Sequence, residues 1–316
     1  MNEYAETNGP SVGVVGKLPS QADFVRQHVS DRVGGEFDRW LVKSTQSMLS
    51  AKAELPAAVR FVVSVAGCDS VAVGVLVPSR DQVGRTFPLA IYTALPAPFA
   101  GRHALGLPLA YLQFLDDAET LALEAANASA ADLKASVAAL VPPNQEIVLA
   151  ASQQCRDVLG QTSAREMLER VFPTTQGTQP AAPFYALHTF SVASEGARSA
   201  PPSAAPTVLD CPIVTDVDLA AWIDLGRRGT PSQTACPTFA WVQVSPRLLM
   251  VLGYAPEQLL HLVADPKHKS SRLWPLTTER SEAIERAREV LTGRLGSEAA
   301  LASNIDALWN VMSPSK

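Results

Sequence analysis

The polar residues best suited to chemistry lie in two short segments rich in glycine and proline. The first segment contains Lys17 and Asp23, and the second contains Arg85. An aspartate can act as a general base, and an arginine can hold a carboxylate through its paired N–H groups. Two structural interpretations compete with these: Asp23 could cap a turn, and Arg85 could reach Asp23 or another buried acid of the chain. For Arg85 the structural interpretation is preferred.

The standard motifs of catalysis are incomplete in this sequence. Residues 9–13 match G-x-S-x-G, but a hydrolase needs a strand before the serine and a helix after it, and here a polar tail precedes a strand. Residues 13–17 are too short for a phosphate-binding loop, and Leu18 stands where such a loop needs Ser or Thr for Mg²⁺. The sequence therefore predicts no catalytic residue and no cofactor.

Histidines and cysteines also give no metal site at the level of sequence. His261 and His268 flank Asp265-Pro266 and could form a small ligand cluster, but no H-E-x-x-H motif is present, and a solvated loop without a metal is the preferred interpretation. The four cysteines form no C-x-x-C pair, which excludes a familiar zinc motif and favours free thiols in a reducing compartment.

Composition narrows the class of protein. The 316 residues include 47% apolar and 18% charged residues, so the chain can bury a core and is not intrinsically disordered. The net charge of −5 gives no reason to expect nucleic acid as a partner. Met1–Pro10 has no basic segment typical of a secretory signal, and the uncharged residues 86–101 are too short and proline-rich to span a bilayer. We expect a cytoplasmic protein without direct membrane insertion.

The order of the apolar patterns predicts an α/β (α+β) fold, with a largely antiparallel mixed sheet sandwiched by helices and a helical C-terminal portion. The clearest signal is a hairpin, because two β-branched runs, residues 60–66 and 70–77, flank a short turn at Gly67. Further strands are predicted at residues 11–16, 88–95, 184–192, 239–244 and 248–252. Helices are predicted at residues 31–50, 108–126, 130–141, 256–264, 278–291 and 297–312, with partial helix in 212–225.

The same patterns suggest a division of the chain into parts. We expect a flexible tail at residues 1–10 and an α/β domain at 11–172. A loop-rich linker with one strand follows at 173–207, where Pro, Ser, Ala and Gly are frequent, and a C-terminal portion at 208–316 packs on the first domain.

Two segments together resemble the TagF family, also called ImpM, which is associated with bacterial type VI secretion. Residues 16–25 (GKLPSQADFV) are similar to its opening signature G-K-L-P-x-x-G-D-F, with Ala22 in place of the usual glycine. Residues 78–89 (PSRDQVGRTFPL) are similar to its second signature P-S-x-D-x-V-G-R-x-F-P-L. Residues 236–241 (CPTFAW) resemble a later C-P-S-L-W-W segment, in which Ala240 replaces one tryptophan. The resemblance makes these residues candidates for the motif or for partner binding: Gly16, Lys17, Leu18, Pro19, Asp23, Phe24, Gly84, Arg85, Pro88 and Trp241.

The resemblance implies regulation rather than catalysis. Members of the family look like cytoplasmic, non-enzymatic, post-translational repressors of type VI secretion assembly that act through a forkhead-associated scaffold protein, Fha. The alternative is a small-molecule-binding or hydrolytic α/β enzyme with its site at Lys17, Asp23 and Arg85. The absence of a nucleophile–base pair weighs against this alternative.

Overall fold

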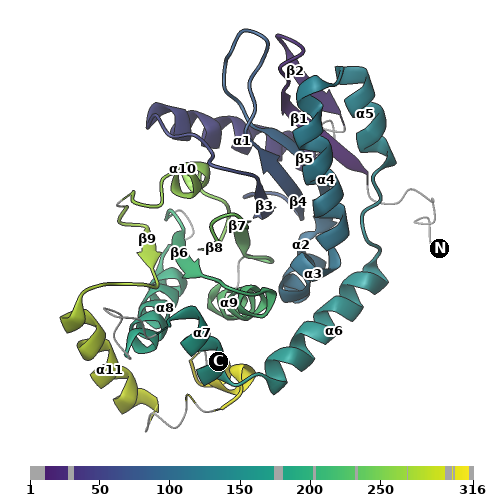
Figure 1. The fold of residues 1–316 in the computed structure, drawn as a ribbon. Coiled ribbons are helices and arrows are strands. Elements are labelled where there is room, and N and C mark those ends of the chain that lie inside the picture. The colour runs from purple at the N-terminus through teal and green to yellow at the C-terminus, as the bar shows by residue number, and fades with distance from the viewer. Residues whose placement is uncertain are drawn as a thin grey trace.

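The computed structural model describes residues 11–27, 32–173, 181–201, 204–231, 234–268, 270–295, 301 and 303–312. In this part of the chain the fold is mixed α/β, with one nine-stranded sheet between two helical layers (Figure 1). The expected fold class, a largely antiparallel sheet sandwiched by helices, is confirmed. The predicted tail at residues 1–10 lies outside the described residues.

The sheet runs through both halves of the sequence. Its strands, in spatial order, are β2 (Phe24–Gln27), β1 (Val12–Lys17), β5 (Leu89–Pro96), β4 (Ser70–Val77), β3 (Val59–Ser64), β7 (Thr238–Val242), β8 (Arg247–Leu252), β6 (Thr207–Pro212) and β9 (Leu273–Pro275). Neighbouring strands are antiparallel, except that β6 and β9 are parallel. The predicted hairpin is confirmed as β3 and β4, with Val59 opposite Leu76.

Helices cover both faces of the sheet. On one face lie α1 (Arg32–Ser50) and α10 (Leu259–Ala264), which pack against each other (Figure 1). The helices that pack into the larger core of the other face are α2 (Ala97–Arg102), α3 (Leu107–Ala110), α4 (Leu112–Glu124), α5 (Ala130–Ala139), α6 (Gln145–Gln161), α7 (Ala164–Val171), α8 (Ala182–Ser199), α9 (Asp216–Gly229), α11 (Ser281–Leu295) and α12 (Ile305–Met312). Two short 3₁₀ turns, Ala104–Gly106 and Ala125–Asn127, lie among them.

Alternation along the strands explains why two separate cores form. Val14 of β1 faces the larger core, whereas its neighbour Val15 faces the core under α1 and α10. The same alternation separates Phe239 and Trp241 of β7, in the larger core, from Ala240 in the smaller one. Because successive strand residues point to opposite faces, a strand buried on both sides must be apolar throughout.

Several helices begin at a residue that caps their first free N–H groups. The side chains of Ser129, Asn144 and Ser163 each accept a backbone N–H three residues along, at the starts of α5, α6 and α7. Thr215 and Asp218 form a capping box at the start of α9. These local signals fix where the helical layer begins, although α6 and α7 were not among the predicted helices.

One element was predicted wrongly. Residues 184–192 were expected to form a strand and residues 193–206 a loop, but Ala182–Ser199 is the helix α8. Phe184, Leu187 and Phe190 are all buried and lie three residues apart, which is a helical spacing, and Pro183 occupies the first turn, where proline is tolerated. The aromatic and β-branched residues of this segment suggested a strand, but tertiary burial along one face overrode that preference.

The boundaries at the C-terminal end follow the prediction only in part. Of the helix expected at residues 297–312, residues 305–312 are helical as α12, while 297–300 and 302 lie outside the described residues. The sheet itself passes from β3 to β7, between the two halves of the sequence. The division into domains at residues 172 and 208 stays a prediction.

Within the described residues, the helices are all too short or too polar to cross a lipid bilayer.

Candidate functional site: the loops around Asp81

The two signature segments form adjoining loops at one edge of the sheet. Strand β1 ends at Lys17, and the loop from β4 to β5 passes beside it because β1 pairs with β5. The hydroxyl of Ser79 donates a hydrogen bond to the carbonyl of Lys17 at 2.7 Å, and the amide of Gln82 donates one to the carbonyl of Gln21 at 3.0 Å. The resemblance to a family therefore corresponds to one structural unit, which we name the signature loops (residues 17–24 and 78–88).

Asp81 is the centre of the signature loops. Its carboxylate is buried and accepts hydrogen bonds from Lys17 Nζ at 2.7 Å and from Arg85 Nε at 2.6 Å, both to Oδ2. The other oxygen, Oδ1, accepts the backbone amides of Val83 at 3.1 Å and Arg85 at 2.8 Å. Four donors therefore converge on one carboxylate, which holds the loop in a tight turn around it.

The electrostatics of this cluster favour the charged form of Asp81. Burial by itself raises the pKa of the carboxyl, but the hydrogen bonds from Lys17 and Arg85 oppose it and lower that pKa well below its ordinary value of 3.8. The ammonium of Lys17 is almost fully buried, with 8% of its side chain exposed, and Asp81 supplies the matching charge. This arrangement argues against a catalytic use of Lys17, since its charge is already bound within the chain.

Arg85 links the two loops and remains open to solvent. Its Nη2 donates to the carbonyl of Ala22 at 2.9 Å, while 61% of its side chain is exposed. Arg85 thus reaches a buried acid of its own chain, and this acid is Asp81 rather than Asp23. Ala22 contributes a backbone carbonyl and does not have a positive φ, so alanine is accommodated where the family usually has glycine.

Two glycines are required by the backbone of these loops. A Cβ on Gly16, whose φ is +151°, would lie only 2.4 Å from the carbonyl oxygen of Pro88. Gly84 has a φ of +86°, in the left-handed region, where the chain turns back toward Arg85. Both glycines therefore have structural roles.

Buried apolar and aromatic side chains pack against the signature loops. Leu18 is fully buried, and the rings of Phe24 and Phe87 pack edge to face with centroids 4.7 Å apart. The ring of Phe24 also lies 5.4 Å from Lys17 Nζ and 4.4 Å from the guanidinium carbon of Arg26. The resulting surface presents Pro19, Asp23, Val83 and Arg85 as exposed side chains.

Two of the candidate residues do not join the cluster of charges. Asp23 is exposed, and its carboxylate is not among the groups bonded to Lys17, Asp81 or Arg85. Trp241 lies on β7, four strands away from β1 and thus about 19 Å across the sheet. It is buried and lines a cavity of about 180 Å³ together with Arg60, whose guanidinium is paired with Asp116 and Glu119.

Sequence reasoning missed Asp81 as the central residue. It belongs to the second signature, in which only Gly84, Arg85 and Pro88 were singled out from the sequence, while Asp23 of the first signature was the acid considered. A signal was present, since Asp81 is the only acidic residue in 78–89, a segment with two arginines. A single acid among cations in a short loop between two buried strands is a good candidate for an internal ion pair.

A second polar cluster lies at the end of α10, where the sequence suggested only a solvated loop. His261 lies on the helix predicted at residues 256–264 and is buried, with 9% exposed, so only the solvated environment expected for this residue was wrong. Asp265 and His268 are partly buried and follow in the turn after the helix.

Comparisons with known proteins agree with the N-terminal signatures. Residues 13–140 match the family model described as TagF N-terminal domain, type VI secretion system-associated. Among solved structures, a crystal structure of PA0076 from Pseudomonas aeruginosa PAO1 covers 84% of this chain and 99% of its own, at 19% identity and a TM-score of 0.46, a likeness too loose to support a functional argument. No curated protein sequence matches the chain. Residues 13–140 of this chain belong to the TagF N-terminal domain family, which is associated with the type VI secretion system.

Proposed function

We propose that this protein is a non-enzymatic, cytoplasmic accessory protein of a type VI secretion system that represses its assembly after translation. It would do so by binding an Fha-type scaffold protein. The family match supports the association with secretion. The observation that carries the proposal is the ion pair between Lys17 and Asp81. Because these two charges are paired with each other, they stabilise the surface of the signature loops and are not available for catalysis.

The braced surface has the features of a small docking site. Asp81 holds the turn from residue 81 to residue 85 in one conformation, so binding would cost little ordering of the loop. Val83 stands at the tip of this turn with 67% of its surface exposed, beside the exposed guanidinium of Arg85. Arginine is enriched among the residues that dominate interfaces, and an exposed valine beside it adds apolar area that binding would bury. We therefore propose that Val83, Arg85 and Asp23 contact the scaffold.

Secretion of the tube protein tests the repressor role. We expect overexpression of this chain to silence secretion and deletion of its gene to release it. Unchanged secretion in both strains would overturn the proposal.

A surface variant then tests the docking site. Val83→Ser removes an exposed apolar side chain and leaves every bond of Asp81 in place, because Val83 contributes only its backbone amide. The matched control is Val244→Ser, a valine 84% exposed in the turn between β7 and β8. We expect Val83→Ser to weaken both repression and capture of purified Fha scaffold by tenfold or more, with the control unchanged. Equal capture by both variants would place the contact elsewhere.

A further inference from the structure

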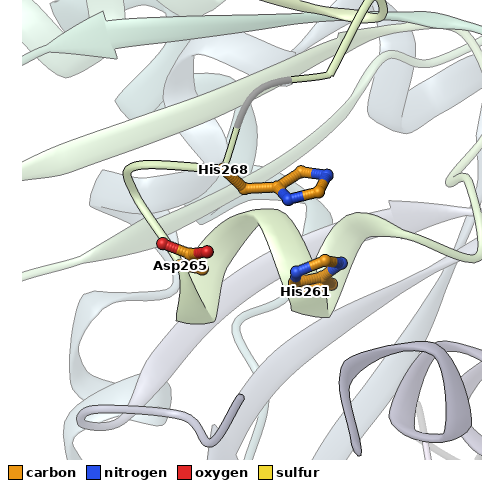
Figure 2. A group of neighbouring side chains, drawn as sticks. All are labelled: His261, Asp265 and His268. Carbon is orange, nitrogen blue, oxygen red and sulfur yellow. The ribbon is translucent and has the colours of Figure 1, made fainter. Parts of the chain in front are cut away.

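Three potential metal ligands converge at the end of α10. Figure 2 shows His268 folded back over His261, with Asp265 beside the last turn of the helix. The imidazole rings lie with centroids 4.1 Å apart and planes inclined by 47°. One ligand atom from each of His261, Asp265 and His268 lies within 4.8 Å of the others.

The backbone holds these residues in place. The amide of Asp265 donates to the carbonyl of His261 at 2.9 Å, and the amide of His268 donates to the carbonyl of Asp265 at 3.1 Å. The side chain of Asp265 uses Oδ1 to accept the amide of Lys267 at 3.1 Å, which orients the carboxylate. Asp265 and His268 lie beyond the last residue of α10, so the turn that folds back over the helix, rather than helical spacing, brings the three side chains together.

The helix that carries His261 is itself anchored. The amide of Leu260 donates to Ser44 Oγ of α1 at 3.2 Å, and Trp40 Nε1 donates to the carbonyl of Pro256 at 3.1 Å. Arg247 Nη1 donates to the carbonyl of Leu262 at 2.9 Å, and its charge is matched by Asp210. A ligand set on a fixed helix requires less reorganisation on binding than one on a loop.

We propose that His261, Asp265 and His268 bind one divalent transition-metal ion of the zinc class. Two imidazoles and one carboxylate suit zinc, copper, nickel or iron, and disfavour magnesium and calcium, which take oxygen ligands. Three protein ligands leave a coordination position for water or for a group from another molecule. The site is independent of the proposed function and would tie the turn at residues 265–268 to α10.

The observed spacing is compatible with such an ion. Bonds of about 2.0–2.2 Å in a tetrahedral site place ligand atoms about 3.4 Å apart. The three ligand atoms now lie within 4.8 Å of one another. Side-chain rotations that shorten these separations by little more than an ångström would bring the atoms to the tetrahedral spacing.

Metal titration of the full chain tests the site. After treatment with a chelator and its removal, Zn²⁺ is titrated by calorimetry, and Co²⁺ by visible absorption. We expect one equivalent to bind, a cobalt spectrum of nitrogen and oxygen ligands without thiolate charge transfer, and a rise in Tm of about 4 °C at hundredfold excess over Kd. Failure to bind either ion, or a thiolate band, would overturn the proposal.

Variants identify the ligands. His268→Gln, at a partly exposed position, is the primary variant because it leaves the buried His261 and the helix intact, and we expect at least tenfold weaker binding. Asp265→Asn keeps the shape of the side chain and tests the carboxylate. The matched control is His103→Gln, a partly buried histidine outside the cluster, and it should bind as the wild type does. Wild-type affinity in His268→Gln would overturn the assignment.

Discussion

The signature loops and the His261–Asp265–His268 cluster are two polar clusters that differ in how their polar groups are satisfied. In the first, a buried carboxylate receives four donors from its own chain, so its charge is satisfied on folding. In the second, two imidazoles and a carboxylate converge, and the rings lie against each other. An ion cluster whose hydrogen bonds are all made within the chain stabilises the conformation of its loops, whereas converging ligand atoms can bind an added metal ion.

This difference predicts where stability depends on polar groups. The signature loops should be costly to disturb, because removing one charge strands another in a buried site. The histidine cluster should be inexpensive to disturb in the absence of metal, because no buried charge depends on it. The following variants measure this contrast.

The largest effect is expected for Asp81→Ala. This change leaves the ammonium of Lys17 buried without a matching charge and releases the amides of Val83 and Arg85. We expect Tm to fall by about 6 °C in thermal unfolding followed by circular dichroism. The double variant Lys17→Met/Asp81→Leu, which removes both charges, should recover part of this loss. A single variant as stable as the wild type would contradict the central role of Asp81.

A smaller effect is expected from acid. The pKa of Asp81 in the folded protein is lower than its ordinary value of 3.8, so the carboxylate stabilises the fold above that pH. This contribution is lost as the pH falls below about 4 toward the lowered pKa. We expect the difference in Tm between the wild type and Asp81→Asn to stay constant from pH 7 to pH 5 and to narrow below pH 4. A difference in Tm between the two proteins that widens in acid would contradict a lowered pKa of Asp81.

Arg85→Ala should cost less again. The guanidinium is largely exposed and solvent screens its interaction with Asp81, although its bond to the carbonyl of Ala22 is lost. We expect a decrease in Tm of about 2 °C, measured beside Asp81→Ala under the same conditions. A loss as large as that of Asp81→Ala would show that Arg85, rather than Lys17, provides the main support of the turn.

The smallest effect on the metal-free protein is expected for His268→Gln. This side chain is only partly buried, and its removal leaves no buried charge without a partner. After chelation, we expect Tm within about 1 °C of the wild type, because substitutions away from buried networks change little. A large loss in the absence of metal would mean that the histidine pair stabilises the fold by itself.

The sequence predicted the strands best where local chemistry is strong. The runs that became β3 and β4 are β-branched and bounded by a turn, so their pairing needs no knowledge of the rest of the chain. By contrast, β9 has three residues, and β2 follows a proline-containing loop; both depend on neighbours that only the folded chain supplies. The helix α8 was mistaken for a strand because residue preference is weaker evidence than burial at helical spacing.

The candidate site was predictable in its residues more than in its connections. Lys17 and Arg85 were identified, and an internal acid was expected as the partner of Arg85, but Asp81 emerged only when the two loops were placed side by side. The histidines were recognised as neighbours that flank Asp265, yet a solvated loop was the preferred interpretation of the segment. Their convergence depends on the chain folding back over α10, which no local pattern reveals.

The pairing of β3 with β7 has a consequence for any fragment of this molecule. The residues that match the family end at 140, but Arg60, Phe61 and Val62 of β3 pair with strand residues 239–241, far beyond that point. A fragment ending at residue 140 would leave the buried backbone of β3 as a bare, apolar sheet edge. Such edges pair with one another between molecules, so we expect the fragment to self-associate. In the whole chain, β7 of the C-terminal half covers this edge and prevents such pairing.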